Sequence, residues 1–230
     1  MVSPRLERIL KRIKDETLRG KVAEILENPT IRIGDEAFSG LALEDSPAAL
    51  WQHHTYSGGL IEHIEATAEI AITLCRVIEK VYKGKVDRDV VLAGVLLHDV
   101  FKPLTYALQE NGSVGSSPLG EKLDHLSLVV SELIRRNFPL EVVHTVCAHH
   151  GEYGPMKPKT LEALVCFLAD YADSQLNGGV LRAAKHIARE ATGGEIEGLT
   201  AREAFKIVHL KAAEGLEGVR KFLEKREGRI

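Results

Sequence analysis

The sequence predicts an all-α protein, and two observations carry that prediction. Hydrophobic residues make up 44% of the 230 residues but aromatic residues only 5%, so the core must consist mainly of Leu, Val, Ile and Ala. Such a composition favours helices, and apolar residues recur at helical spacing through most of the chain. The length is enough for one large core, or for one domain with appendages.

The bulk composition narrows the class of partners and the compartment. With a net charge of −3, the chain has no overall basic field for long nucleic acid. Cys75, Cys147 and Cys166 lie in apolar helical patterns without CxxC spacing, so we expect no disulfides and a reducing compartment. No apolar run is long enough to span a bilayer, and the N-terminus has no signal core. We therefore expect a soluble, cytoplasmic protein with no membrane partner.

The N-terminal segment, residues 1–44, is predicted to be a helix followed by a loop. Leu6, Ile9 and Leu10 begin an apolar helical pattern that continues to Glu27, and Asn28 and Pro29 end it. The residues that follow are irregular, apart from a short strand expected at residues 31–33.

The central segment, residues 45–177, is predicted to hold five helices. Capping or helix-breaking residues bound them at residues 60–82, 87–98, 124–137, 140–150 and from Thr160 onward. A loop rich in Gly and Ser, residues 103–121, interrupts this core, and a loop of that length is usually functional or mobile.

The C-terminal segment, residues 178–230, is predicted to be a helical extension. Gly178-Gly179 is expected to separate it from the core. A short helix should follow at residues 180–191. A further helix begins at a capping box of Thr200 and Glu203 and runs towards Phe222.

The histidines are not scattered as structural histidines would be. Six of the ten lie at predicted helix ends or in first turns, and most have an Asp or another His directly beside them: His54, His63, His98, His125, His149 and His150. An imidazole next to a carboxylate, as in His98-Asp99, suits a divalent cation. Asp170 lies inside an apolar run, where a carboxylate without a partner would be costly. Taken alone, a His-Asp pair at a helix end is more often a cap than a ligand.

The order of these residues carries a family resemblance. His63, His98-Asp99, His125, His149-His150 and Asp170 together resemble the HD-domain superfamily of metal-dependent phosphohydrolases. The segments 47–63 and 149–173 are similar to the HD module of YhaM-type 3′→5′ exoribonucleases. The resemblance covers roughly residues 45–177 and implies an HD-domain helical bundle with an N-terminal helix and a C-terminal helical extension.

Three departures from that pattern concern the shape of the site and the mode of action. Phe101 and Asp124 stand where the family usually has Gly, which bears on loop shape and pocket width. The YhaM family also carries an OB-type nucleic-acid module ahead of its HD domain. Residues 1–44 are too short for such a module, which weakens the implication of processive RNA degradation.

The resemblance implies two divalent cations. One would be held by His63, His98, Asp99 and Asp170, and Asp99 would bridge to the other. Mixed imidazole and carboxylate ligands favour Mn, Fe, Co, Ni or Zn over Mg alone. Two such cations can hold a hydroxide and polarise a phosphoryl oxygen. The ligands implied for the second cation are His125, His149 and His150.

Asp99, Lys102 and His54 are the candidate catalytic residues, and His54, Tyr56 and Lys102 the candidate substrate-binding residues. Lys102 would contact a phosphate oxygen, or is a surface lysine at a helix end. His54 would contact the substrate or donate a proton, or it stabilises a turn. Asp173 lies one turn from Asp170 and would orient a ligand imidazole, unless it is a surface residue. The aromatic residues expected near enough to stack a base are Tyr56, Phe101, Tyr106 and Tyr153.

We therefore expect a divalent-metal-dependent phosphohydrolase that cleaves phosphodiester bonds of RNA or oligonucleotides by a metal-bound hydroxide. A nucleotidase acting on small nucleotides is the first alternative, since single-strand binding uses basic grooves and aromatic platforms that this composition lacks. A non-catalytic, nucleotide-binding regulatory HD module is the second, favoured if Phe101 closes the pocket. A histidine cluster that holds no metal is the third. The terminal helices would cover the core or form a homodimer interface.

Overall fold

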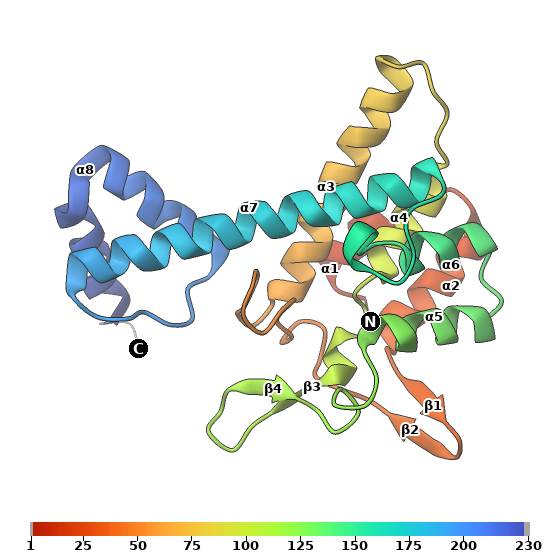
Figure 1. Cartoon of the computed structure of the whole chain (residues 1–230), viewed down its shortest axis with the longest axis horizontal. Coiled ribbons are helices and arrows are strands. Elements are labelled where there is room, and N and C mark those ends of the chain that lie inside the picture. Colours follow the sequence, from red (N-terminus) through yellow and green to blue (C-terminus); the bar gives the residue numbers. More distant parts are fainter. Residues whose placement is uncertain (1, 228–230) are drawn as a thin grey trace.

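A computed structural model describes residues 2–227 and shows an elongated, helical molecule (Figure 1). The predicted all-α class is confirmed: the described residues form eight α-helices, with only two short β-hairpins beside them. Met1 and residues 228–230, at the outer ends of the predicted first and third segments, lie outside the described residues. Within residues 2–227, no helix is both long and apolar enough to cross a membrane.

The N-terminal segment holds two helices, so the prediction of one continuous helix is wrong. Helix α1 spans Pro4–Leu10 and α2 spans Glu16–Glu27. The chain turns between them because the carboxylate of Asp89 accepts hydrogen bonds from the backbone N–H groups of Lys14 and Asp15, at 3.0 and 2.8 Å. The side chain of Asp15 in turn caps α2. A contact with a residue far along the chain therefore sets the break.

A hairpin follows the two N-terminal helices. The short strand expected at residues 31–33 is present as β1, Ile31–Ile33, and pairs antiparallel with β2, Glu36–Phe38. A second hairpin interrupts the Gly- and Ser-rich loop expected at residues 103–121. There a 3-10 turn at residues 102–105 leads into β3, Tyr106–Leu108, which pairs with β4, Val114–Ser116. Much of that loop is therefore regular structure.

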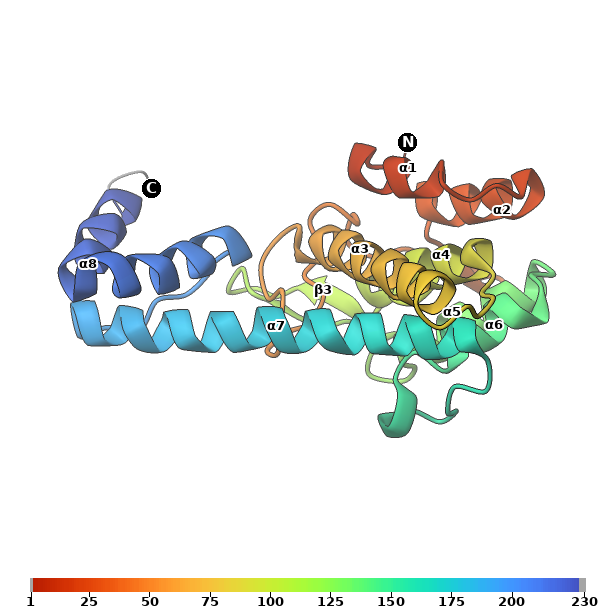
Figure 2. The same cartoon turned by 90° about the horizontal axis from the view of Figure 1, so that it is seen from above.

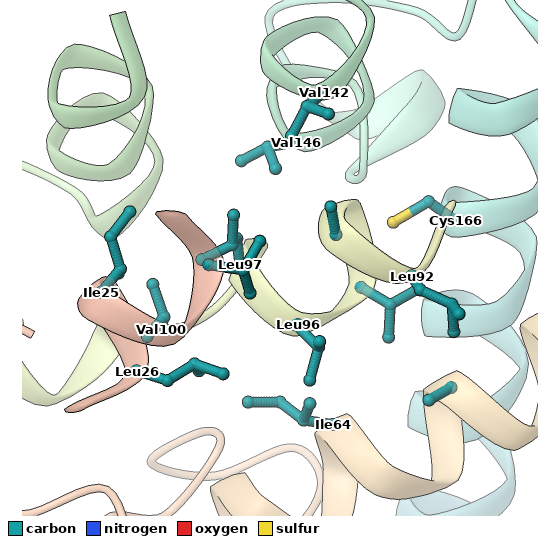
Figure 3. Packing of buried hydrophobic residues seen from close by; sticks show 14 of the residues in the cluster. Ile25, Leu26, Ile64, Leu92, Leu96, Leu97, Val100, Val142, Val146 and Cys166 are labelled. Carbon is teal, nitrogen blue, oxygen red and sulfur yellow. The ribbon is translucent and has the colours of Figure 1, made fainter. Parts of the chain in front are cut away.

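Helix α4, Arg88–Leu97, lies at the centre of the main core. Every residue from Val90 to Leu97 is buried, because α4 is surrounded by other helices. One of them is α2. Its predicted cap, Asp87, is confirmed by hydrogen bonds from the N–H groups of Asp89 and Val90. Leu92, Leu96 and Leu97 of α4 fill the space between the neighbouring helices (Figure 3). These neighbours are α3 (Gly59–Lys80), α6 (Leu140–Cys147) and α7 (Leu161–Thr192), while α5 (His125–Arg135) packs on α6.

Helix α7 is continuous over 32 residues, so the break predicted at Gly178-Gly179 is wrong. A Cβ atom on Gly178 would lie 3.0 Å from the carbonyl oxygen of Gln52, so this glycine permits a close approach of the chain to the helix. The predicted cap at Thr160 is confirmed, since its side chain accepts the N–H of Ala163. The boundary expected between residues 177 and 178 falls inside this helix.

The far half of α7 packs against α8, Ala201–Glu227, at the end of the molecule away from the main core (Figure 2). Together they enclose a second hydrophobic cluster that includes Leu181, Leu199 and Ile207. The predicted capping box is confirmed, because the N–H of Thr200 donates to Glu203 and the N–H of Glu203 donates to Thr200 Oγ1. Helix α8 bends at Gly215, where φ is 70°.

Candidate metal centre

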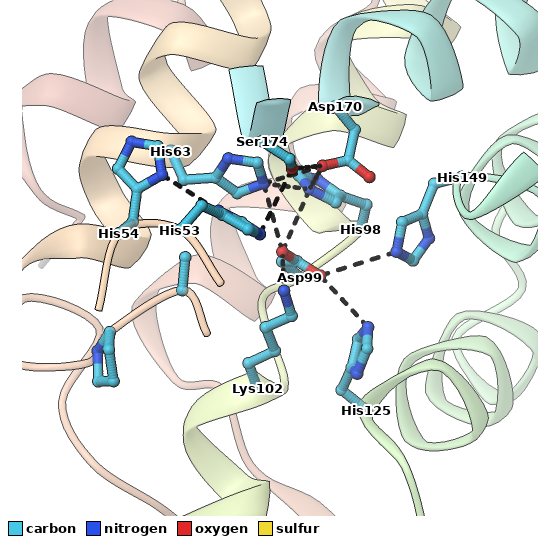
Figure 4. A network of polar contacts seen from close by, with 12 residues as sticks. His53, His54, His63, His98, Asp99, Lys102, His125, His149, Asp170 and Ser174 are labelled. Atoms are coloured by element: carbon cyan, nitrogen blue, oxygen red, sulfur yellow. Dashed lines mark hydrogen bonds and ion pairs between the residues drawn. The ribbon is translucent and has the colours of Figure 1, made fainter. Parts of the chain in front are cut away.

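Helix ends and the middle of one helix bring the predicted metal ligands together, and Figure 4 shows all of them but His150. His98 caps the C-terminus of α4, and Asp99 follows it. His63 lies early in α3, and Asp170 lies in α7. The remaining three are His125 at the start of α5 and His149 and His150 directly after α6.

One group of donor atoms gathers around Nε2 of His63. That nitrogen lies 3.2 Å from Nε2 of His98 and 3.1 Å from Oδ1 of Asp170. Oδ2 of Asp99 lies 3.4 Å from both imidazole nitrogens. His63, His98 and Asp99 are all buried. The four side chains thus converge on one point.

A second group gathers around the other carboxylate oxygen of Asp99. Oδ1 of Asp99 lies 3.3 Å from Nε2 of His125 and 3.7 Å from Nε2 of His149. His150 completes this group, since the donor nitrogens of His125, His149 and His150 lie within 4.8 Å of one another. Asp99 therefore stands between the two groups, with one oxygen toward each.

The orientation of the imidazole rings fits cation binding. Nδ1 of His98 lies 2.7 Å from the carbonyl oxygen of Val95, and Nδ1 of His149 lies 2.7 Å from that of Val146. Each Nδ1 must carry the proton to donate to a carbonyl, which leaves the Nε2 lone pair of the neutral ring facing the centre. Backbone carbonyls thus orient both rings with Nε2 toward the centre, as cation binding requires.

Several potential donor atoms at this centre have no hydrogen-bond partner, which also fits the binding of divalent cations. Among the described residues, Asp99 Oδ1, His125 Nε2 and His149 Nε2 are buried and have no hydrogen-bond partner. Orphaned polar atoms are costly in a protein interior unless something else pairs with them. Ligands bound at about 2.1 Å around one cation lie about 3.0–3.4 Å apart, which matches the spacing of the closest donors.

The pKa values of the central residues follow from their surroundings. Burial lowers the pKa of His149 well below its usual value, and the neighbouring His98 and His150 lower it further, so the ring stays neutral as a ligand must. Burial acts to raise the pKa of Asp99, but Lys102 and His98 outweigh it and hold that pKa well below its usual value. His63 differs: burial acts to lower its pKa, but hydrogen bonds to Asp170, among others, raise it.

A cavity of about 490 Å³ opens directly onto this centre. The residues that line it include Lys102, His149, His150 and Asp170. Nζ of Lys102 lies 2.6 Å from Oδ2 of Asp99, and its side chain is only 12% exposed. Burial acts to lower the pKa of Lys102, but the Asp99 carboxylate raises it, so the amine remains a cation. The lysine thus presents a fixed positive charge beside the ligands.

Comparison with known proteins identifies the family. The model of the HD domain family matches residues 60–175, about half of the chain. The chain belongs to the HD-domain family. The family resemblance seen in the sequence is therefore confirmed, and the protein is a metal-dependent phosphohydrolase of that family. No solved structure matches it.

Three curated relatives share the HD domain to different extents. The dihydroneopterin 2′,3′-cyclic phosphate phosphodiesterase of Methanocaldococcus jannaschii is 39% identical over 211 residues, which are 92% of this chain and 84% of that protein. The 3′-5′ exoribonuclease YhaM of Bacillus subtilis is 32% identical over 58% of this chain and 44% of its own length. YhaM of Oceanobacillus iheyensis is 31% identical over 72% of this chain and 55% of its own length. The chain thus spans about half the length of the YhaM proteins.

The two residues that depart from the HD-domain pattern have structural roles. Phe101 is buried in the main hydrophobic core, so it does not close the cavity or offer a stacking surface there. Asp124 caps α5 by accepting the N–H of Ser127 at 2.6 Å, a bond that Gly could not supply. Neither residue obstructs the metal ligands.

Two predicted substrate contacts do not line the cavity. His54 is buried, with φ of 46°, and its N–H donates to the side-chain oxygen of Asn177 at 2.7 Å. Tyr56 is buried too, and its hydroxyl donates to Glu62. Neither side chain lines the cavity, whereas His53 does. The positive φ at His54 sets which of the two adjacent histidines faces the cavity, and no sequence pattern signals it.

Other polar and aromatic candidates lie at different depths. Asp173 is buried and lies 2.7 Å from Nδ1 of His63, so it is not a surface residue. Tyr153 lines the cavity and is 83% exposed. Tyr106 is half-buried, and its hydroxyl lies 3.5 Å from the carbonyl oxygen of Ala48. Of the four aromatic residues expected to stack a base, Tyr153 is the one on the cavity.

Proposed function

We propose that this HD-domain phosphohydrolase hydrolyses a small cyclic phosphodiester of the 2′,3′-cyclic phosphate type, with dihydroneopterin 2′,3′-cyclic phosphate as the first candidate. The size of the cavity at the metal ligands carries the proposal. A volume of about 490 Å³ lies within the range of small-molecule sites. The likeness to the Methanocaldococcus jannaschii phosphodiesterase, which extends over 92% of the chain, supports this substrate.

The reaction adds one water across a phosphorus–oxygen bond. The water oxygen bonds to phosphorus, the bond to one of the two vicinal oxygens breaks, and the released hydroxyl keeps one proton. A phosphomonoester remains. Divalent cations held by the two donor groups would supply an activated water and neutralise charge on the phosphoryl oxygens. We propose two such cations, with Asp99 shared between them, because each of its oxygens faces a separate donor group.

Two side chains on the cavity would act on the substrate directly. Lys102 holds its charge next to Asp99, where it would stabilise negative charge that develops on the phosphoryl oxygens. His53 would form a neutral hydrogen bond to the phosphate or the leaving oxygen. Burial lowers the pKa of His53 to about 3, with a further contribution from His63, so the ring carries no charge at neutral pH. We propose His53 in the role that the sequence suggested for His54.

A second candidate function is the trimming of oligoribonucleotides from their 3′ ends. The observation that favours it is the similarity to two YhaM proteins, at 32% and 31% identity. That similarity reaches only 44% and 55% of the length of those two proteins. We rank this function below the small cyclic phosphodiester.

The test compares substrates on one metal-loaded preparation. Protein purified without a chelating tag is analysed for metal content, supplemented with Mn or Fe, and assayed by phosphorus NMR. The substrates are dihydroneopterin 2′,3′-cyclic phosphate, guanosine 2′,3′-cyclic phosphate, a nucleoside monophosphate and an oligoribonucleotide. We expect the cyclic phosphates to open to monoesters that persist. Trimming of the oligonucleotide alone would instead assign the YhaM-like function, and release of free phosphate from the monophosphate alone would assign a nucleotidase.

Two variants link any activity to the proposed centre. Asp99→Asn removes charge from the residue shared by both donor groups, so activity should fall below detection and metal content should drop. Asp35→Asn makes the same change on the exposed turn between β1 and β2 and should behave as the wild type. Equal activity in the two variants would contradict the proposed centre.

A further inference from the structure

Part of the cavity lining is not used by the proposed hydrolytic chemistry. Besides the candidate metal ligands, three aromatic side chains line the cavity: Tyr153, Phe167 and Tyr171. We call these three residues the aromatic wall. Phe167 and Tyr171 lie one turn apart on α7, with ring centroids 6.0 Å apart and planes inclined by 40°. The same helix supplies Asp170, so the aromatic wall begins one residue from a metal ligand.

The aromatic wall is held in place by a close backbone contact. Gly151 has φ of 55°, and a Cβ atom there would lie 2.3 Å from the ring of Phe167. The turn that follows His150 therefore rests directly on that ring, which only a glycine allows. This turn carries Tyr153, so the packing of Gly151 brings the third aromatic residue to the cavity.

The outer part of the aromatic wall is open to solvent. Tyr153 is 83% exposed and Tyr171 is 44% exposed. Large aromatic surface left exposed beside a polar cavity marks a binding site more often than a structural feature. Gln52 and Gln175 also line the cavity, and both are exposed. Each carboxamide offers a hydrogen-bond donor and an acceptor. The polar edge of a heterocycle carries complementary acceptors and donors.

We propose that the aromatic wall binds the planar heterocycle of the substrate, a pterin or a purine, while its cyclic phosphate lies at the metal ligands. This inference rests on the proposed function and names the part of the substrate that is not the phosphate. Stacking on Tyr153 and Tyr171 would hold the ring, and Gln52 and Gln175 would bind its polar edge. The cavity would then select substrates that carry both a phosphodiester and an attached aromatic ring.

The test measures a specificity ratio in variants that lose an aromatic ring. The value of kcat/KM for dihydroneopterin 2′,3′-cyclic phosphate or guanosine 2′,3′-cyclic phosphate is divided by that for glycerol 1,2-cyclic phosphate, which has no ring. Tyr171→Leu and Tyr153→Leu should each lower this ratio about 10- to 100-fold, mainly through KM for the ring-bearing substrate. Tyr82→Leu removes an exposed tyrosine just after the C-terminal end of α3 and should keep the wild-type ratio.

Each outcome bears on a named part of the inference. In the wild type, a larger ratio for the dihydroneopterin substrate identifies the ring as a pterin, and a larger ratio for the guanosine substrate identifies it as a purine. If both cavity variants keep the wild-type ratio, the proposed binding of the ring is overturned. It is also overturned if Tyr171→Leu changes the oligomeric state of the protein and nothing else. If no cyclic phosphate is cleaved, the proposed function fails. The aromatic wall is then tested by dialysis with neopterin and guanosine, which should bind the wild type about 10-fold more tightly than Tyr171→Leu. Equal binding overturns the inference.

Discussion

Asp173 accepts the Nδ1–H of His63 at 2.7 Å, one turn along α7 from Asp170, which lies 3.1 Å from Nε2 of the same ring. Two carboxylates on one helix thus contact the two nitrogens of a single imidazole. The inner one belongs to the donor group, and the outer one fixes the tautomer of His63. Outer carboxylates of this kind raise the basicity of a ligand histidine and hold its ring in place.

Replacing Asp173 should weaken metal binding without removing a ligand. We expect Asp173→Asn to lower the affinity for Mn about 10- to 100-fold, because a neutral amide stabilises the Nδ1–H of His63 less than a carboxylate does. Calorimetric titration of the metal-free protein with Mn measures this affinity. Asp35→Asn on the exposed hairpin turn is the matched control. An affinity equal to that of the wild type would show that His63 does not need its outer carboxylate.

Replacing Lys102 should impair turnover more than metal loading. We expect Lys102→Gln to lower kcat about 10²- to 10³-fold, since one fixed positive charge beside Asp99 is lost. The metal content should be retained, because the ligands themselves are unchanged. Steady-state kinetics with elemental analysis checks both points, with the exposed Lys122→Gln as the control. Loss of metal in step with loss of activity would assign Lys102 to the binding of the cations instead.

The contact between α4 and α6 depends on a glycine. A Cβ atom on Gly94 would lie 2.3 Å from Cγ2 of Thr145, so Gly94→Ala must push the two helices apart. We expect its free energy of unfolding to fall by about 1–3 kcal/mol, as for other overpacked cores. Gly20 lies inside α2 with nothing within 4 Å of its added Cβ, so Gly20→Ala should stabilise by about 1 kcal/mol. Urea denaturation measures the free energy of unfolding of both variants. A stabilised Gly94→Ala protein would contradict the close contact between α4 and α6.

A buried carboxylate on α5 should make stability depend on pH. Glu132 is 1% exposed and accepts hydrogen bonds from Arg135 and Arg136, at 2.7 and 2.6 Å. Burial acts to raise the pKa of Glu132, but the two arginines outweigh it and lower that pKa from its usual value of 4.5. A depressed pKa in the folded state adds stability above the unfolded pKa, and this stability is lost as the pH falls through the folded pKa.

Comparison of Glu132→Gln with the wild type tests that dependence. At pH 7 we expect the variant to be less stable by about 1–2 kcal/mol, because the charge-assisted hydrogen bonds to the arginines are weakened. The difference should shrink below about pH 4.5, where the carboxylate of the unfolded chain already binds a proton. Urea denaturation at pH 7 and at pH 4 measures it. A difference that grows on acidification would have the wrong sign for this mechanism.

Helix positions were predictable from local patterns where caps and apolar spacing agree. Asp87 and Thr160 cap α4 and α7 as expected. The two errors have a common cause. The break before Glu16 is stabilised by Asp89, and Gly178, through which α7 continues, lies against the backbone of Gln52. Both positions make contacts with distant parts of the chain, which local periodicity does not report.

By itself, the sequence determined the helical class and the ordered set of candidate imidazole and carboxylate ligands, because apolar spacing and side-chain chemistry are properties of the individual residues. Only the tertiary structure decided how those groups face one another. It turned the two oxygens of Asp99 toward separate donor groups and set His53, but not His54, on the cavity. The physical reason is that Asn177, 123 residues further along the chain, holds the N–H of His54 in a strained turn.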